Sequence, residues 1–455
     1  MLRQLIDHAE SEKIEVLATA RELLNRLTER LAGPYRNLVA AAGRLTDAAL
    51  VASVAGRIES ARYNDDVSYD LRLARTLASK LARGSTERGD PEGFAYAVEL
   101  LGAQGVGVHA SDAEVKAAGR ILSDPKAPLE AATEIARLGL PVVGMALDDS
   151  GLMTMTVTSE GPQPPVAVQS GAFDAKLLLG WSRTFPLGYS NPNLAQEDFR
   201  AVTKGLGLPE LPDRAVMLSG YLSLVPPNVL TVGGDLAGLT KSLATVPSLS
   251  WLKASIAAAR KGDGSAAAWI PIAAGGSHMD TLSLMAGDIG ELLDAAKIEL
   301  HTQSATPVAL ASADLAIVGA HGGLAEGNRF FRGLSDDRDE PADLRQLVDA
   351  LRGSRVAVLF VCSGGRLDQH PESGGLVGIA HRLLDKGLDA VVAPSWPIPF
   401  TMVRPWLNAF LKAWNGGSPI IDAYRAGNEA VAAATSIDPA RSLAMSLYGN
   451  PFVKR

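Results

Sequence analysis

Uninterrupted apolar runs alternate with amphipathic helical patterns in the second half of this 455-residue chain, and this alternation restricts the possible folds most strongly. Two of the runs, 315–318 and 356–361, contain no polar side chain, as expected of strands that are buried on both faces of a sheet. We predict strands at 267–273, 298–302, 314–320, 355–361 and 389–395, and helices at 283–296, 341–352, 375–386, 400–414 and 419–433. Strands that alternate with helices of this length predict an α/β fold, a doubly wound and mostly parallel sheet flanked by helices.

The sequence before this alternation divides into two regions with different residue patterns. Residues 1–138 show leucines at helical spacing and predict an all-helical region. Its helices are expected at 36–61, 67–83, 91–103, 111–123 and 127–138, with a break at Gly84-Ser85. Residues 139–265 open with a β-hairpin over 140–158 and continue with short pieces between proline-marked turns. With 266–455 as a third region, the chain fits three domains of about 100–200 residues each.

Composition restricts the compartment and the partners. The net charge is −7 and no basic tract is present, which argues against nucleic acid or an anionic membrane as a partner. No uncharged apolar stretch is long enough to span a bilayer, and the N-terminal residues lack the apolar core of a signal peptide. The single cysteine excludes an internal disulfide framework, which fits a reducing compartment. We therefore expect a soluble, cytoplasmic protein.

The single cysteine and one histidine occupy equivalent places in the predicted sheet. Cys362 follows the run 356–361 and precedes Ser363-Gly364-Gly365, while His321 follows the other run and precedes Gly322-Gly323. Parallel strands end at one edge of the sheet, where ligands bind, and glycines let the backbone approach them closely. A lone cysteine after an apolar strand is more often an inert buried residue. The pairing with a histidine and with glycines favours a catalytic role.

A thiol beside an imidazole is suited to acyl transfer. An unperturbed thiol has a pKa of about 8.5 and is mostly protonated at neutral pH, so a base must activate it. We predict Cys362 as the nucleophile and His321 as the general acid and base. The backbone N–H groups of Gly322 and Cys362 are the predicted oxyanion donors, a device worth about 3–4 kcal/mol per donor in other enzymes. His370 is a weaker candidate for the place of His321.

The sequence lacks the motifs of several other classes of catalytic or binding site. The sequence contains no G-x-S-x-G elbow and no glycine-rich loop that ends in Lys and Ser or Thr, which argues against a serine hydrolase and a P-loop nucleotide site. The histidines are scattered and no second cysteine is present, so no spacing suited to zinc is found.

These motifs, and the order in which they follow one another, resemble those of a known protein family. The segments 314–322 and 359–364 resemble the His-Gly and Cys strand ends of the CHAT proteases, which are bacterial relatives of caspases and separases. Three later segments resemble, in order, the glycine-led helix, the next strand and the terminal signature of that family: 374–380, 391–397 and 448–451. The resemblance covers roughly residues 139–455.

The resemblance implies a caspase-like sheet that cleaves a protein substrate through a Cys–His dyad, without a metal or an organic cofactor. It also implies that 139–265 is a degenerate caspase-like half packed against the catalytic half, 266–455. The helical region 1–138 is then a sensor or docking region for an activating protein partner, in a setting of bacterial antiviral defence or cell death. Two alternatives stay open: a non-catalytic scaffold on the same fold, and a Cys–His amidase or acyltransferase that acts on a small molecule.

The expected substrate strand departs from the patterns of both related groups. Ser395-Trp396-Pro397 stands where caspases carry Ser-Trp-Arg, so a preference for aspartate is not expected. The next residues, 398–400, lack the acidic side chains of many CHAT proteins, so a preference for a basic residue is not expected either. We predict that Ser395 and Trp396 bind substrate, with a core position for Trp396 as the equal alternative. The charged stretch 332–341 is expected to be a solvated loop, or alternatively a mobile activation or substrate-guiding loop.

Overall fold

The computed structural model describes the following residues: 16, 67–103, 124–148, 151–168, 207–208, 210–218, 226–258, 260–273, 277, 280–324, 331–336, 341–342, 344–369, 376–434 and 439–455. The helices predicted at 36–61 and 111–123 and the candidate His370 lie outside these residues.

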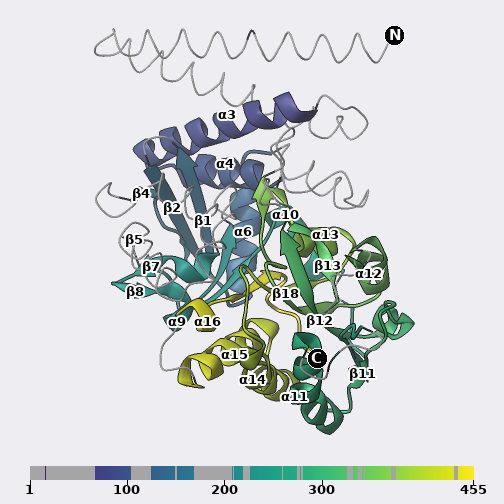
Figure 1. Ribbon diagram of the computed structural model, residues 1–455. Helices are drawn as coiled ribbons and strands as arrows, with labels where there is room; N and C mark the ends of the chain where they lie inside the picture. Colours follow the sequence, from purple (N-terminus) through teal and green to yellow (C-terminus); the bar gives the residue numbers. More distant parts are fainter. Residues whose placement is uncertain are drawn as a thin grey trace, which may run out of the picture.

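One long mixed sheet runs through the protein (Figure 1). Its main strands are β1 (Val142–Asp148), β2 (Gly151–Thr158), β3 (Gly161–Pro162), β6 (Arg214–Leu218), β9 (Ser242–Thr245), β10 (Ala266–Trp269), β11 (Glu299–His301), β12 (Leu315–Leu324), β15 (Val356–Val361), β18 (Ala390–Pro394) and β19 (Met445–Gly449). They lie in the order β11-β10-β12-β15-β18-β19-β9-β6-β1-β2-β3. The strands β11, β10, β12, β15 and β18 are parallel to one another, and so are β1, β6 and β9. The mostly parallel sheet predicted from the apolar runs is confirmed.

Helices cover this sheet close to the predicted positions. In the second half they are α11 (Thr281–Ala295), α12 (Leu344–Leu351), α13 (Ile379–Asp385), α14 (Val403–Asn415) and α15 (Ile420–Ala434). The predicted starts of two helices are wrong. Residues 341–342 form β14 (Pro341–Ala342) and 376–377 form β17 (Leu376–Val377), each paired with a neighbouring strand. Both helices begin only where apolar residues recur at helical spacing. The residues before that point are stabilised by pairing with a neighbouring strand instead.

The strand β19 joins two halves of the sheet. It pairs antiparallel with β18 and parallel with β9, so the strands of the two halves run in opposite directions. Asn228, which is fully buried, donates from its amide to the carbonyl of Met445 at 2.8 Å and accepts from the hydroxyl of Tyr424 at 2.9 Å. A polar side chain of the first half therefore holds the strand at the seam, and burial makes the loss of its partners costly.

Three helices of the N-terminal region pack on the first half of the sheet: α3 (Val67–Arg88), α4 (Pro91–Ala103) and α6 (Ala127–Arg137) (Figure 1). Phe94 and Val98 of α4 share one hydrophobic core with the strands. The break predicted at Gly84-Ser85 is wrong, because α3 continues to Arg88. One glycine costs a helix only about 1 kcal/mol, less than its packing can supply. None of the helices in the described ranges combines the length and hydropathy that crossing a membrane requires.

A buried carboxylate ties α4 to the sheet-bearing part of the chain. Glu99 is fully buried and accepts hydrogen bonds from the backbone N–H groups of Leu249 at 2.7 Å and Ser250 at 3.0 Å, and a short one from the Ser250 hydroxyl. These donors lie in the first turn of α10 (Leu249–Ala257), where an N–H group has no partner within the helix. Burial raises the pKa of Glu99, and the three hydrogen bonds oppose this shift.

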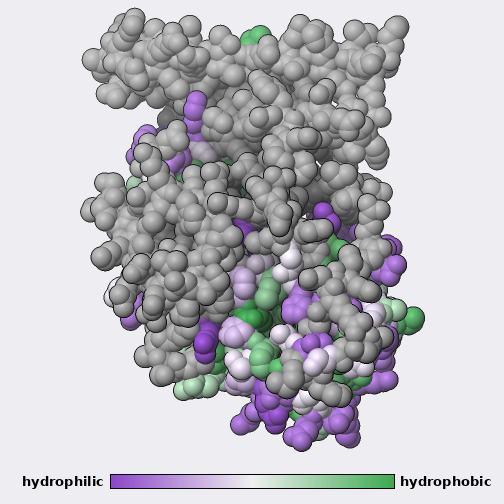
Figure 2. All heavy atoms as spheres, in the orientation of Figure 1, coloured by the Kyte–Doolittle hydropathy of each residue, from purple (hydrophilic) through white to green (hydrophobic). Residues whose placement is uncertain are grey.

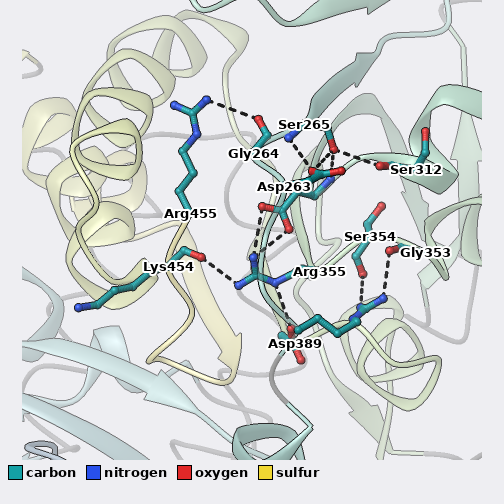
Figure 3. Close-up of polar contacts among 12 residues, drawn as sticks. Asp263, Gly264, Ser265, Ser312, Gly353, Ser354, Arg355, Asp389, Lys454 and Arg455 are labelled. Carbon is teal, nitrogen blue, oxygen red and sulfur yellow. Dashed lines mark hydrogen bonds and ion pairs between the residues drawn. The ribbon is translucent and has the colours of Figure 1, made fainter.

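A second buried network fixes the amino ends of the central strands (Figure 3). Arg355, which precedes β15, contacts Asp314 before β12 (Nη1–Oδ1 3.0 Å) and Asp389 before β18 (Nε–Oδ2 3.6 Å). Its other terminal nitrogen donates to the carbonyl of Lys454 at 2.9 Å. Three neighbouring strands thus start at one level, which aligns their carboxyl ends on the opposite edge.

Candidate active site

His321 and Cys362 lie where the parallel pairing of the neighbouring strands β12 and β15 ends. In the register of β12 and β15, Ala320 stands opposite Val361, and the two candidate residues directly follow this pair. Both are half-buried. The structure therefore brings the two predicted residues to the same edge of the sheet.

The strand that carries His321 continues beyond it. From His321 to Leu324, β12 pairs antiparallel with β13 (Phe331–Ser335), with His321 opposite Ser335. The prediction of a solvated loop at 332–341 is therefore wrong for 332–336, where Leu334 and Asp336 are buried. The burial of Leu334 beside β12 favours the strand more than the surrounding charged side chains favour a solvated loop. Residues 337–340 lie outside the described part of the chain.

Gly322 brings two backbones into direct contact. A β-carbon at this position would overlap the carbonyl oxygen of Cys362 and crowd a methyl group of Val361. Because Gly322 lies within β12, it does not form a turn, and its lack of a side chain lets the two backbones approach each other closely. The strand that holds His321 can pack this tightly against the residue that holds the thiol only without a side chain here.

The thiol stands at the corner of a tight turn. The N–H of Gly364 donates to the carbonyl of Val361 at 2.8 Å, which makes Cys362 and Ser363 the central residues of the turn. Ser363 has a φ of 59°, a left-handed conformation that costs a non-glycine residue about 1–2 kcal/mol. The N–H of Gly365 donates to the carbonyl of Pro394, at the end of β18. Sequence reasoning missed Ser363, although a Ser-Gly pair after a strand is a turn signal.

The environment of the sulfur favours the protonated thiol. Burial raises the pKa of Cys362, while hydrogen bonds with the backbone of Ile398, Gly322 and Cys362 itself act in the opposite direction. The Sγ atom lies 4.0 Å from the carbonyl oxygen of Ile398, toward which the thiol donates. Ile398 is a neighbour of the thiol that the sequence analysis did not select. Within the described residues, no three His, Cys, Asp or Glu side chains are placed to hold a metal ion.

The two predicted substrate-binding residues are buried beneath this edge. Trp396 has no exposed surface, and only 8% of Ser395 is exposed. The Ser395 hydroxyl lies 3.3 Å from that of Ser446 and 3.2 Å from that of Tyr448, which links β18 to β19. In this conformation Trp396 lies in the core, which the sequence analysis gave as the alternative to substrate binding. Substrate binding by either residue stays a prediction.

Comparison with known proteins gives a likeness in fold. No protein-family model and no curated protein sequence matches the chain. Two crystal structures of the Saccharomyces cerevisiae separase–securin complex match with TM-scores of 0.53 and 0.55, at 11% and 10% identity, over 90% and 96% of this chain. The chain spans only 38% and 40% of the length of those matched chains.

A more distant match is the Arg-specific cysteine proteinase gingipain R, at 11% identity over 61% of this chain and 74% of that one. Its TM-score of 0.36 is too low to carry an argument. The separase likeness extends over nearly the whole chain, from the helices to the seam strand. The chain therefore has a mostly parallel α/β fold that resembles the fold of separase.

Proposed function

We propose that this chain is a cysteine endopeptidase of the CHAT type, with Cys362 as the nucleophile and His321 as the general acid and base. The observation that carries the proposal is the register of β12 and β15, in which both residues directly follow one strand pair. The backbone contact at Gly322 and the turn at Ser363 support it further, because each fixes one member of the pair relative to the other.

The reaction follows from these groups. His321 takes the proton of the Cys362 thiol, and Sγ attacks the carbonyl carbon of the substrate peptide bond. The N–H groups of Gly322 and Cys362 stabilise the resulting oxyanion. The C–N bond then breaks, His321 gives its proton to the departing amine, and a thioester remains on Cys362. Water, deprotonated by His321, hydrolyses the thioester to a free carboxyl group and restores the thiol.

The resting thiol requires activation in this scheme. Burial raises the pKa of Cys362, so the thiol is protonated at neutral pH and a further step must expose it or bring the imidazole to it. We assign that step to a protein partner that binds the helical region 1–138. Glu99 on α4 is hydrogen-bonded to the first turn of α10, so a partner that moves α4 would also move α10. The separase structures were solved with a protein partner, securin, bound to separase.

The substrate is a protein in this proposal, and the setting is bacterial defence or cell death. The test compares the full-length wild type with Cys362→Ala and His321→Ala, each co-expressed with candidate proteins, including the products of neighbouring genes. Mass spectrometry of newly formed protein N-termini is the measurement. We expect new termini with the wild type and none with either variant.

Thermal unfolding serves as the control that both variants fold. Identical termini in wild type and variants under every co-expression condition would overturn the proposal and favour a scaffold. Hydrolysis of small amides without any protein cleavage would favour an amidase.

A further inference from the structure

An apolar surface segment lies directly beside the candidate nucleophile. Residues 397–400, here called the apolar wall, follow β18 and are all half-buried, while Trp396 before them and Met402 after them are buried in the core. The carbonyl of Ile398 lies 4.0 Å from the Cys362 sulfur. The side chains of Ile398 and Phe400 pack against the core and keep part of their surface outside it.

No charge borders the apolar wall along the chain. Between Asp389 and Arg404 the sequence contains only two polar residues, both hydroxyl side chains. Asp389 precedes β18 and thus lies at the other end of that strand. Arg404 is turned toward α11, where its guanidinium contacts Asp288 (Nη1–Oδ1 3.4 Å) and Glu291 (Nη2–Oε2 3.7 Å).

Two charged residues of the other elements at this edge are withdrawn from the surface. Asp336, which follows β13, is 4% exposed, and Arg366, which follows the turn of Cys362, is 8% exposed. Figure 2 shows hydrophobic residues gathered on the visible face, in the area where Figure 1 draws β18 and α15, with hydrophilic residues around them. On the side of the sulfur that faces residues 397–400, the described side chains are therefore apolar.

The distance limits of the reaction decide which part of a substrate meets this surface. Attack requires the substrate carbonyl carbon to come within about 3–3.5 Å of Sγ. The side chain of the residue that bears this carbonyl begins only two bonds away, so it must lie against the groups that surround the sulfur. A charged side chain packed against residues 397–400 would lose hydration without gaining a partner from them.

We propose that the apolar wall selects a large aliphatic side chain at the substrate residue that bears the attacked carbonyl, with Ile398 as the main specificity-determining residue. The inference rests on the proposed peptidase function. The wall acts through side-chain packing, because Pro397 and Pro399 have no N–H group with which to pair a substrate strand. The fixed φ angles of the two prolines also keep the backbone of the wall rigid. The wall therefore distinguishes substrate side chains by their size and polarity.

The test uses three peptide acyloxymethyl ketones that differ only in the residue next to the electrophile, which is Leu, Asp or Arg. The rate of covalent addition to the full-length protein is followed by intact mass, with Cys362→Ala as the blank. We expect the Leu probe to react at least tenfold faster than the other two. Equal rates, or faster reaction with Asp or Arg, would overturn the inference and leave the peptidase proposal standing. If no probe reacts, either with the protein alone or after its co-expression with the candidate proteins, the peptidase proposal fails and this inference fails with it.

A charge placed on the wall gives an independent readout. Ile398→Asp should lower the rate with the Leu probe at least tenfold and raise the rate with the Arg probe. Val308→Asp is the matched control, since Val308 is 87% exposed and lies in the 3-10 helix before β12, and we expect it to leave all three rates unchanged.

Thermal unfolding establishes that both variants fold. If Ile398→Asp does not fold, Ile398→Ala replaces it and should reduce the preference for Leu without favouring a charge. An unchanged ranking of the three probes in the folded variant would contradict the role of Ile398.

Discussion

Gly322 and the carbonyl oxygen of Cys362 lie so close that no β-carbon fits between them. The strand end that carries the candidate base is thus held against the candidate nucleophile by backbone contact rather than by flexible side chains. Positions set by the backbone vary little as side chains move, so the sheet fixes the backbone positions of the two residues and leaves only their side chains to move.

The first prediction concerns this contact. Gly322→Ala should destabilise the protein by about 1–3 kcal/mol, because the methyl group forces the two strand ends apart. It should also abolish reaction of Cys362 with the peptide ketones. Gly287→Ala in α11 is the control: nothing lies within 4 Å of its β-carbon, and the exchange should stabilise the helix by up to about 1 kcal/mol. Urea unfolding measures both effects, and a fully reactive Gly322→Ala protein would contradict the prediction.

The second prediction concerns the pH dependence of the thiol. Because burial raises the pKa of Cys362, the fraction of thiolate at pH 7.5 is smaller than in a free cysteine peptide of pKa about 8.5. Alkylation by iodoacetamide should therefore be slower than for the peptide, and its rate should still rise above the pH at which the rate for the peptide levels off. In urea the two rates should become equal. A plateau of the rate near pH 6–7 would instead mean that the resting imidazole already holds the thiol proton.

The third prediction concerns Glu99. The folded protein keeps a proton on this buried carboxyl to higher pH than the unfolded chain, whose reference pKa is 4.5. The stabilisation from this group is complete below the unfolded pKa and is lost as the pH rises through the raised folded value. The free energy of unfolding of the wild type should therefore fall relative to that of Glu99→Gln over this window. Parallel pH profiles in urea unfolding would show that the carboxylate is stabilised fully by its donors.

Truncation at the same position tests the hydrogen bonds themselves. Glu99→Ala leaves the N–H groups of Leu249 and Ser250 buried without this acceptor, which should cost about 1–3 kcal/mol.

The fourth prediction concerns the strand-start network. Arg355→Met removes the cation between Asp314 and Asp389 and should cost about 3–5 kcal/mol, because two carboxylates stay buried without it. The comparison is Arg214→Met, whose ion pair with Asp422 at 2.6 Å is exposed to solvent and should contribute less than about 1 kcal/mol. Thermal unfolding of the two variants ranks them, and similar losses would contradict the role given to Arg355.

The buried strands could be predicted because their pattern has a single physical explanation. Runs such as 356–361 are apolar on both faces, and only a covered parallel sheet accommodates several of them in order. The shared edge of Cys362 and His321 followed directly from that parallel arrangement. The roles of the two residues in catalysis stay predictions.

Features that depend on contacts distant in sequence could not be predicted. Nothing local to 332–336 reveals that β12 offers it a partner strand, since its charges match those of a solvated loop. The burial of Trp396 depends on packing in the folded chain, and the nearness of Ile398 to the thiol depends on how the chain leaves β18. The continuation of α3 through Gly84-Ser85 is likewise decided by packing on α4, which outweighs the local preference.

The position of β19 has a consequence for biosynthesis. Because residues 445–449 fill the gap between β9 and β18, both neighbouring strands keep an open edge until the ribosome has made almost the whole described chain. Exposed edges bind other strands readily, so an unfinished chain is open to aggregation and to quality-control proteases. A message broken between codons 362 and 445 therefore yields a fragment that contains both candidate catalytic residues but cannot close the sheet that supports them.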